Sequence, residues 1–261
     1  MLSRLVFLVV ALTPARAEFR DVLKSADIDA ELAAGREALL LERPAYAIRL
    51  KVLNGQPGSV EISRPADQIL HVRKGHASVT LAGRRQEVGP GDFIHIPRTT
   101  AHTIDPGGGR LEFVVVSILP TGDNLPTRQG FLGPRRMPHV LKKADIDSTI
   151  EANDRNQPLH SSPGYTLNYV IYPSLPGPWE AHRECVDIYF VQRGTAKALL
   201  GGEITNPREE SPGEIRGDGV KGAREYDIGP GDMVHIPRNG AHHMIPGRGK
   251  LAYLLLKIWA E

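Results

Sequence analysis

The chain has 261 residues, with 32 Lys or Arg against 30 Asp or Glu, so its formal net charge near pH 7 is only +2. This balance gives no electrostatic basis for binding nucleic acid or an anionic membrane surface. The one cysteine, Cys185, excludes an internal disulfide, and the fold must therefore rest on its hydrophobic cores. Cys185 could pair with another chain or bind a metal, but a packing role is the simpler interpretation.

Residues 1–17 have the pattern of a secretory signal peptide. One arginine precedes an apolar run at residues 5–12, and an Ala-Arg-Ala sequence that ends at Ala17 provides a small-x-small cleavage site. The run is too short to span a bilayer, and no other segment resembles a membrane span. We expect cleavage after Ala17 and a periplasmic or secreted protein. The remaining chain carries 30 basic and 30 acidic residues, because the removed segment holds two arginines and no acid.

Two long segments of the chain have nearly the same sequence. Residues 88–118 and 228–258 align without a gap, and 15 of these 31 positions are identical. The similarity extends upstream, since an LKxADID sequence begins at Leu23 and again at Leu141. A repeat of this length exceeds the unit of a solenoid and is long enough to be a folded domain. We therefore predict two copies of one small domain.

Within each copy, short apolar runs alternate with Gly, Pro, Asn and Asp. The segments 24–32 and 142–152 are predicted as short helices or entry arms. Runs this short, with turn residues about every ten positions, predict antiparallel strands that close into a sandwich or barrel. In the first copy the predicted strands are residues 46–53, 68–72, 77–81, 93–96 and 111–118.

The same patterns predict the domain boundaries. We expect an N-terminal barrel over residues 18–120, a linker rich in Gly, Pro and Arg over 121–140, and a C-terminal barrel over 141–261. The second copy also carries 21 additional residues, within the polar and glycine-rich stretch 201–225. This insertion is either a solvated hairpin, which is the simpler interpretation, or a flap over the mouth of the barrel.

The motifs that the two copies share resemble those of the cupin superfamily. Gly-Pro-Gly-Asp at 89–92 and 229–232 predicts a tight turn, and the following sequences, GDFIHIPRTTAH and GDMVHIPRNGAH, are similar to the second cupin motif. The segments ADQILHVRKG and VDIYFVQRG resemble the second half of the first cupin motif. The resemblance covers nearly the whole chain after residue 17. It implies an all-β bicupin of two tandem jelly-roll barrels, each with an internal pocket.

The resemblance also implies where a metal would bind. Cupins place two histidines spaced by one residue, a carboxylate and the histidine of the second motif around one divalent ion, and residues i and i+2 of a strand face the same side. In the second copy, four side chains take these positions under the longer of two family spacings: Glu180, His182, Asp187 and His242. Such a set can bind Mn, Fe(II), Ni or Zn. Under the shorter spacing, Ala181 and Arg183 would replace the pair and could not bind metal.

The first copy keeps little of this pattern. Its carboxylate position is Gln68, and its second motif retains His102. The remaining positions hold no pair of strong ligands under either spacing: Glu61 and Ser63, or Ile62 and Arg64. We therefore expect no metal in the N-terminal barrel.

Three further positions of the motifs have more than one interpretation. Tyr189 shares a strand face with Asp187, so it lines the same cavity as a wall, a hydrogen-bond donor or an acid. Glu180 is either a ligand or a general base beside three ligands. His95 and His235 occur in both copies, including the copy without the metal set, which predicts a shared structural role such as a hydrogen bond.

Three functions are compatible with these patterns. The first is a metal-dependent enzyme of dioxygenase, decarboxylase, isomerase or lyase type that acts on a small polar or phenolic substrate, and the retention of Asp187 and His242 favours it. The second is a non-catalytic protein that binds a sugar or organic acid, which the loss of the first site favours. The third is a structural module that forms homodimers through outward-facing residues such as Phe190 and Leu254. The fold alone does not choose among them.

Overall fold

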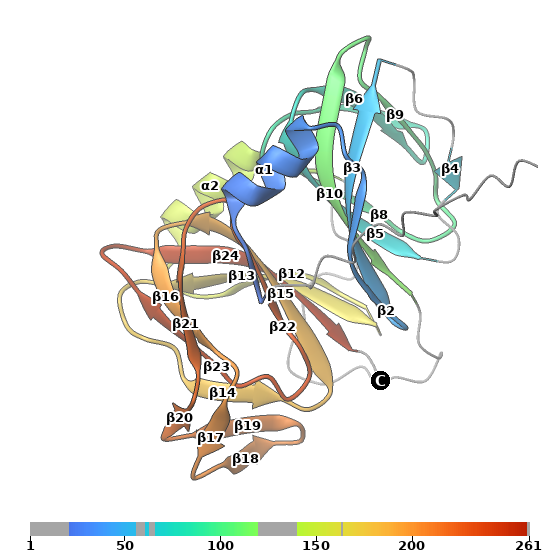
Figure 1. Cartoon of the computed structure of the whole chain (residues 1–261). Helices are drawn as coiled ribbons and strands as arrows, with labels where there is room; N and C mark the ends of the chain where they lie inside the picture. The colour runs from blue at the N-terminus through green and yellow to red at the C-terminus, as the bar shows by residue number, and fades with distance from the viewer. Residues whose placement is uncertain (1–20, 56–60, 63–65, 120–139, 163, 260–261) are drawn as a thin grey trace, which may run out of the picture.

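The computed structural model describes residues 21–55, 61–62, 66–119, 140–162 and 164–259. The predicted signal peptide and nearly all of the predicted linker lie outside these residues. The described chain consists mainly of antiparallel strands, with one short helix near the start of each half (Figure 1). The all-β class predicted from the sequence is confirmed. Among these residues, no helix has the length and apolar character that crossing a bilayer requires.

Among its described residues, the first half contributes nine strands to two sheets. They are β2 (Ala38–Arg43), β3 (Tyr46–Asn54), β4 (Glu61–Ile62), β5 (Asp67–Lys74), β6 (Ala77–Leu81), β7 (Arg84–Val88), β8 (Phe93–Ile96), β9 (Ala101–Asp105) and β10 (Arg110–Ile118). The larger sheet includes β8-β5-β10-β3-β2, and the smaller has the order β4-β9-β6-β7. Their inner faces share one apolar core, which includes Leu70, Leu81 and Phe113. Alternate residues reach this core because successive side chains on a strand face opposite sides.

The second half has corresponding strand orders and the inserted strands. Its strands are β12 (Gln157–Ser161), β13 (Tyr165–Tyr172), β14 (Trp179–His182), β15 (Cys185–Arg193), β16 (Ala196–Leu200), β17 (Glu203–Thr205), β18 (Arg208–Ser211), β19 (Glu214–Gly217), β20 (Gly219–Lys221), β21 (Arg224–Ile228), β22 (Met233–Ile236), β23 (His242–Pro246) and β24 (Leu251–Trp259). One sheet includes β22-β15-β24-β13-β12, and the other has the order β18-β19-β14-β23-β16-β21. A small pair, β17-β20, completes the insertion, at the end of the molecule far from the first half (Figure 1).

The arm that precedes each half pairs with a sheet of the other half. Strand β1 (Val22–Leu23) pairs with β22, and β11 (Val140–Leu141) pairs with β8. Helices α1 (Ser25–Ala33) and α2 (Lys143–Ala152) follow these two strands. Each half therefore completes its large sheet with two residues from outside its own repeat, an exchange that the sequence did not indicate.

The repeated Gly-Pro-Gly-Asp turn holds this exchange in place. Asp92 Oδ1 accepts a hydrogen bond from the backbone N–H of Lys143, and Asp232 Oδ1 accepts one from Ser25, both at 2.7 Å. Each aspartate thus satisfies a free N–H in the first turn of the other half's helix. Its second oxygen accepts a backbone N–H within its own turn at 2.9 Å. The two repeated sequences, LKxADID and GPGD, are therefore the two sides of one contact.

A core shared by the two halves joins them into one molecule. Phe93 of the first half and Phe190 of the second meet edge to face with ring centroids 5.2 Å apart, and Leu254 packs in the same core. Phe190 and Leu254, which the sequence offered as a face for a second copy, are therefore covered within the chain. The proposed homodimer cannot use these two residues in this structure.

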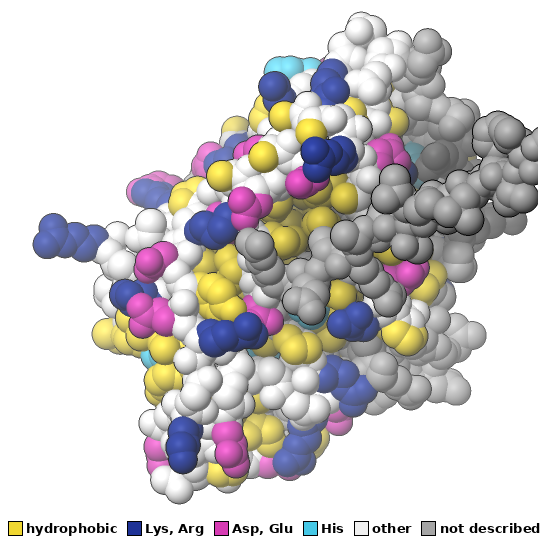
Figure 2. Space-filling model, in the orientation of Figure 1, with side chains coloured by type: hydrophobic (Ala, Val, Ile, Leu, Met, Phe, Trp, Pro, Cys, Tyr) yellow, Lys and Arg dark blue, Asp and Glu magenta, His cyan; other side chains and the backbone are white. Residues whose placement is uncertain are grey.

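His95 and His235 also bridge the two halves. His95 Nε2 lies 2.7 Å from Tyr165 Oη, and His235 Nε2 lies 2.7 Å from Tyr46 Oη. The predicted shared structural role is confirmed, and the partner is in each case a tyrosine of the other half. On the face shown in Figure 2, acidic and basic side chains are interspersed around apolar surface.

Candidate metal centre

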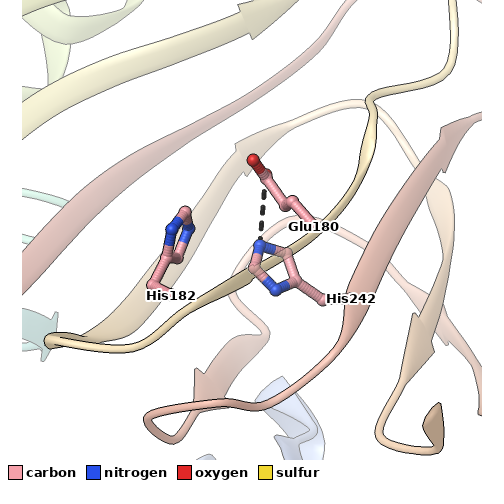
Figure 3. Close-up of side chains that lie close together, drawn as sticks. All are labelled: Glu180, His182 and His242. Atoms are coloured by element: carbon pink, nitrogen blue, oxygen red, sulfur yellow. Dashed lines mark hydrogen bonds and ion pairs between the residues drawn. The ribbon is translucent and has the colours of Figure 1, made fainter. Parts of the chain in front are cut away.

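Three of the predicted ligands meet inside the second half. Glu180, His182 and His242 each offer one donor atom within 4.8 Å of the other two (Figure 3). Glu180 and His182 lie two positions apart on β14 and so face the same side. Glu180 stands opposite His242 in the pairing of β14 with β23. The two residues of the longer family spacing, Glu180 and His182, therefore lie together in the cluster. Ala181, which belongs to the shorter spacing, lies between them on the other face of the strand.

Glu180 and His182 line a cavity of about 840 Å³ between the two large sheets of the second half, and His242 contacts Glu180. The volume suits a small organic molecule. Strands β14 and β19 contribute charged side chains to the lining. The other sheet contributes apolar and aromatic side chains together with a buried ion pair: Val170, Tyr172, Tyr189, Tyr253, Leu255, Asp187 and Lys257. A substrate in this cavity would therefore contact both aromatic surface and charged groups.

A hydrogen bond orients the imidazole of His242, and an ion-pair contact lies at the same nitrogen of His182. His242 Nδ1 lies 3.0 Å from the carbonyl oxygen of Gly240, which can only accept, so Nδ1 carries the hydrogen and Nε2 faces Glu180 Oε1 at 3.1 Å. His182 Nδ1 lies 2.8 Å from Glu214 Oε2. In metal sites the ligating imidazole is held in this way through its other nitrogen. Both rings therefore present Nε2 to the cavity.

The charges in the cluster favour a ligand role for Glu180. Burial alone would raise the pKa of this carboxyl, but the hydrogen bond to His242 and the positive charges of His182 and Arg216 outweigh it and bring the pKa to about 2. A carboxyl with so low a pKa accepts a proton poorly at neutral pH. It suits a metal ligand better than a general base.

His182 is positively charged when no ion is bound. Burial alone would lower its pKa, but the carboxylates of Asp187 and Glu214 outweigh burial and raise the pKa to about 9. A metal that binds Nε2 must displace that proton. His182 and His242 are only 5% and 1% exposed, so the donors are shielded from water. Two buried imidazoles and one ionised carboxylate fit an open divalent-metal site.

Asp187, the fourth predicted ligand, lies outside this three-residue cluster. Its carboxylate contacts His182 Nε2 at 3.4 Å and Lys257 Nζ at 3.5 Å. Asp187 and Lys257 stand opposite each other on β15 and β24 and are 2% and 5% exposed. A metal role for Asp187 stays a prediction. Sequence reasoning missed Lys257, whose signal was a lysine inside an apolar strand at a position where the first copy has Ser117.

Tyr189 lines the cavity, as predicted from its spacing to Asp187. Its ring stacks on Tyr253 with centroids 4.1 Å apart, and its hydroxyl donates a hydrogen bond to Asp187 Oδ2 at 3.4 Å. Burial raises the pKa of this hydroxyl well above its ordinary value. Tyr189 can therefore donate a hydrogen bond at neutral pH but is not available as a phenolate base. Its predicted catalytic role stays a prediction.

The insertion also reaches the cavity, with four lining residues at its β18–β19 hairpin: Ser211, Pro212, Glu214 and Arg216. Arg216 Nη1 lies 2.6 Å from Glu180 Oε2. This part of the insertion is therefore not a purely solvated extension, and its position favours the alternative of a structure at the cavity mouth. The sequence analysis assigned no role to Glu214 or Arg216.

Cys185 lies beside the cluster, and with His182 and Glu214 it forms a second group of possible donors within 4.8 Å. The thiol is buried, and burial raises its pKa above the ordinary value. Because a metal ligand must be the thiolate, this group is a poorer donor set than Glu180, His182 and His242. The packing interpretation of Cys185 agrees with its place in the interior.

The first half has a different interior at the corresponding positions. Glu61 stands opposite His102 in the pairing of β4 with β9, the same register as Glu180 and His242. His102 Nδ1 lies 3.1 Å from a backbone carbonyl, as His242 Nδ1 does. The side chain of Glu61 and residues 63–65, which include two of the alternative pair positions, lie outside the described part of the chain. Whether this barrel binds metal stays untested.

Comparison with known proteins identifies the fold. Residues 50–117 match the family model described as the cupin domain. This segment carries most strands of the first half, whereas the insertion interrupts the corresponding motifs of the second. No curated protein matches the chain. The match lies within the first half and supports the resemblance to cupins found in the repeated motifs.

Solved structures extend the similarity over most of the chain. A Cupin 2 conserved barrel domain protein from Leptotrichia buccalis superposes with a TM-score of 0.56 and 12% identity, covering 85% of this chain and 88% of that one. A salicylate 1,2-dioxygenase from Pseudaminobacter salicylatoxidans gives a TM-score of 0.63 and 9% identity over 96% and 88%. A putative glyoxylate induced protein from Pseudomonas aeruginosa gives 0.54 and 17% over 87% and 80%. At these identities the likeness establishes the cupin fold alone.

Proposed function

We propose that the chain is an exported bicupin whose C-terminal barrel is a divalent-metal-dependent enzyme for a small polar or phenolic substrate. The observation that carries this proposal is the cluster of Glu180, His182 and His242 at the wall of an 840 Å³ cavity. Mn, Fe(II), Ni and Zn all suit such a donor set. Export rests on the signal pattern of residues 1–17. The bicupin organisation rests on the repeated motifs and the corresponding strand orders of the two halves.

Glu180, His182 and His242 would hold the ion, which would supply Lewis acidity or a centre for oxygen chemistry. The chain's other residues bind and orient the substrate. Tyr253 stacks on Tyr189 and offers an aromatic face to a planar ring. The Tyr189 hydroxyl donates its hydrogen to Asp187, and its oxygen can accept a hydrogen bond from a substrate hydroxyl. The family chemistries of dioxygenation, decarboxylation, isomerisation and lyase cleavage all remain open to this site.

The cavity supports a phenolic substrate in two ways. Its aromatic wall suits a ring, and the buried amide of Asn168 leaves its Oδ1 without a hydrogen-bond partner among the described residues. A free carbonyl oxygen at the cavity accepts a hydroxyl group of a ligand. The salicylate 1,2-dioxygenase of the same fold is named for a phenolic acid, which is compatible with a substrate of this class here.

The proposal is tested by the metal content of the chain that begins at Glu18. We expect near-stoichiometric metal by elemental analysis, lost in His242→Ala and retained in Gln68→Ala, which changes the carboxylate position of the first half. Zinc alone would not identify the native ion, because affinity favours Cu and Zn over Mn and Fe. Oxygen uptake with catechols, keto acids and uronates then separates oxygenase chemistry from the other reaction types.

A non-catalytic binding protein is the second candidate. It is favoured by the internal pairing of the acidic groups, since Glu180 contacts Arg216 and Asp187 contacts Lys257. Their charges are therefore balanced in the cavity without an ion. A wild-type chain that takes up no metal on reconstitution, yet binds a sugar or organic acid, would overturn the enzyme proposal in favour of this one.

A further inference from the structure

Strand β19 of the insertion changes the position of the ligand-bearing strand in its sheet. Among the described residues of the first half, the two-residue strand β4 lies at the sheet edge with β9 as its neighbour. In the second half, β14 lies between β23 and β19. A strand with paired neighbours on both sides is held by two ladders of backbone hydrogen bonds. The strand that carries Glu180 and His182 is therefore paired on both sides, whereas β4 has one paired neighbour among the described residues.

The register of β19 places a charged side chain opposite each donor on β14. Arg216 stands opposite Glu180, and Glu214 stands opposite His182. Directly opposed residues on one sheet face are close enough for their side chains to interact. The contacts are short, at 2.6 Å from Arg216 Nη1 to Glu180 Oε2 and 2.8 Å from Glu214 Oε2 to His182 Nδ1. The insertion thus contacts both donors of β14.

The carboxylate of Glu214 lies beside Nδ1 of His182, at the far side of the ring from Nε2. An ionised carboxylate only accepts hydrogen bonds, so it keeps the hydrogen on Nδ1 and leaves Nε2 as the donor atom toward the cavity. The carbonyl of Gly240 has the same effect on His242. His182 has no such carbonyl on its Nδ1 among the described contacts, and the insertion supplies the acceptor instead.

We propose that Glu214 is a positioning residue that holds His182 for metal binding, and that this is the function of strand β19. The inference rests on the proposed function, because it concerns the same ion. A carboxylate hydrogen-bonded to a ligating imidazole fixes the ring and its tautomer. Arg216 supports the arrangement, since it also lies 3.6 Å from Glu214 and offsets the repulsion between Glu214 and Glu180.

The test is the affinity of Glu214→Gln for Mn²⁺ or Co²⁺ alone, measured by competition with a chelator. The substitution keeps the size of the side chain and removes its charge, and we expect metal binding roughly 10–100-fold weaker than in the wild type. The matched control is Glu203→Gln, which removes the same charge from an exposed position on β17 of the same insertion. This control should bind metal like the wild type.

Two further measurements separate positioning from charge. Glu214→Asp keeps the charge but shortens the side chain, so positioning predicts binding nearly as weak as in Glu214→Gln; wild-type affinity in this variant would overturn the inference. The absorption spectrum of Co²⁺ at saturating metal should also change in Glu214→Gln, because the imidazole is free to reorient. A structural role remote from the ion would leave that spectrum unaltered.

The outcomes distinguish the two proposals. If the wild type binds metal and Glu214→Gln binds it equally well, the positioning role is wrong and the proposed function stands. If neither the wild type nor any variant binds metal, both proposals are wrong. Weaker binding in Glu214→Gln and Glu214→Asp, with normal binding in Glu203→Gln, supports the role of β19.

Discussion

The two halves of the chain have corresponding strand orders, and one buried cross-strand pair differs in charge between them. In the second half Asp187 stands opposite Lys257, and in the first half Gln68 stands opposite Ser117 at the corresponding place. Strand pairing is the same around both, so the backbone does not require a charged pair. A buried charge is tolerated only with a partner, and the two positions therefore change together or not at all.

The neighbouring inward-facing side chains are also more polar in the second half than in the first. Tyr189 and Tyr253 stack in the second half, whereas Leu70 and Phe113 occupy the corresponding positions in the apolar core of the first. The same strand positions therefore accommodate either a pair of tyrosine hydroxyls or purely apolar side chains. The choice depends on the side chains that alternate inward, with the backbone held by strand exchange between the halves.

The contrast between the two pairs is tested most directly by Lys257→Ser. This substitution gives the second half the serine that the first half has at the corresponding position. We expect the free energy of unfolding to fall by about 3 kcal/mol, because the buried Asp187 would lose its lysine partner and keep only its contact with His182. Urea denaturation of the metal-free protein measures the loss.

Adding Asp187→Gln to Lys257→Ser completes the first-half pair and should restore most of that stability. Ser117→Ala, in the first half, should cost less than about 1 kcal/mol because no charge loses its partner. A double variant as unstable as Lys257→Ser alone would mean that the lost packing of the lysine, and not the unpaired carboxylate, causes the effect.

A second contrast lies at the contact between the halves, where His71 corresponds to Phe190. His71 stacks on Phe93 with centroids 4.3 Å apart, and burial, assisted by the charges of Arg73 and Lys143, lowers its pKa to about 3. In the unfolded chain His71 binds a proton near pH 6.5, whereas in the folded chain its imidazole stays neutral until the pH falls to about 3. Stability is therefore full above pH 6.5 and falls as the pH drops toward 3.

The substitution His71→Phe should remove this acid sensitivity. At pH 5 the buried histidine lowers the free energy of unfolding by about 2 kcal/mol relative to pH 7, and the variant should lack that part of the loss. Unfolding curves at both pH values measure it. The exposed His76→Gln variant serves as the control; an identical pH profile in His71→Phe and the wild type would contradict the assignment.

The sequence predicted the fold and the three-residue cluster for a local reason. Glu180 and His182 are two positions apart on a strand and so share a face, and the resemblance of the repeated motif to the second cupin motif implied His242. Lys257 could not be found in this way, because only the register of β24 against β15 shows that it faces Asp187. A lysine near the end of a strand ordinarily lies at the surface.

The exchange of strands and the role of the insertion depend on pairing over long sequence separations. Strands β1 and β11 have two residues each, too few for an apolar pattern to reveal their partners. Glu214 and Arg216 lie in a polar, glycine-rich stretch that has the composition of a solvated loop. Only the pairing of β19 with β14 turns these two residues toward the cavity.

The cavity-facing part of the insertion is tested by Arg216→Gln. Arg216 contacts Glu180, Glu210 and Glu214, and its loss leaves the first of these without its guanidinium partner in a buried cluster. We expect the metal-free protein to lose about 2 kcal/mol of stability. Because a bound divalent cation would take over the balancing charge, thermal unfolding should show a smaller loss with metal present. An equal loss in both states would exclude this compensation.

The smallest expected effect comes from Arg208→Gln, on the outer side of the same insertion. Arg208 Nη1 lies 2.8 Å from Asp218 Oδ1, but these side chains are 63% and 57% exposed, and exposed ion pairs contribute little to stability. We expect no measurable change in urea unfolding and no change in metal affinity. An equal loss of unfolding free energy in Arg208→Gln and Arg216→Gln would mean that the hairpin stabilises the second half through its outer side as well. The difference between the halves would then not depend on the side chains that face the cavity.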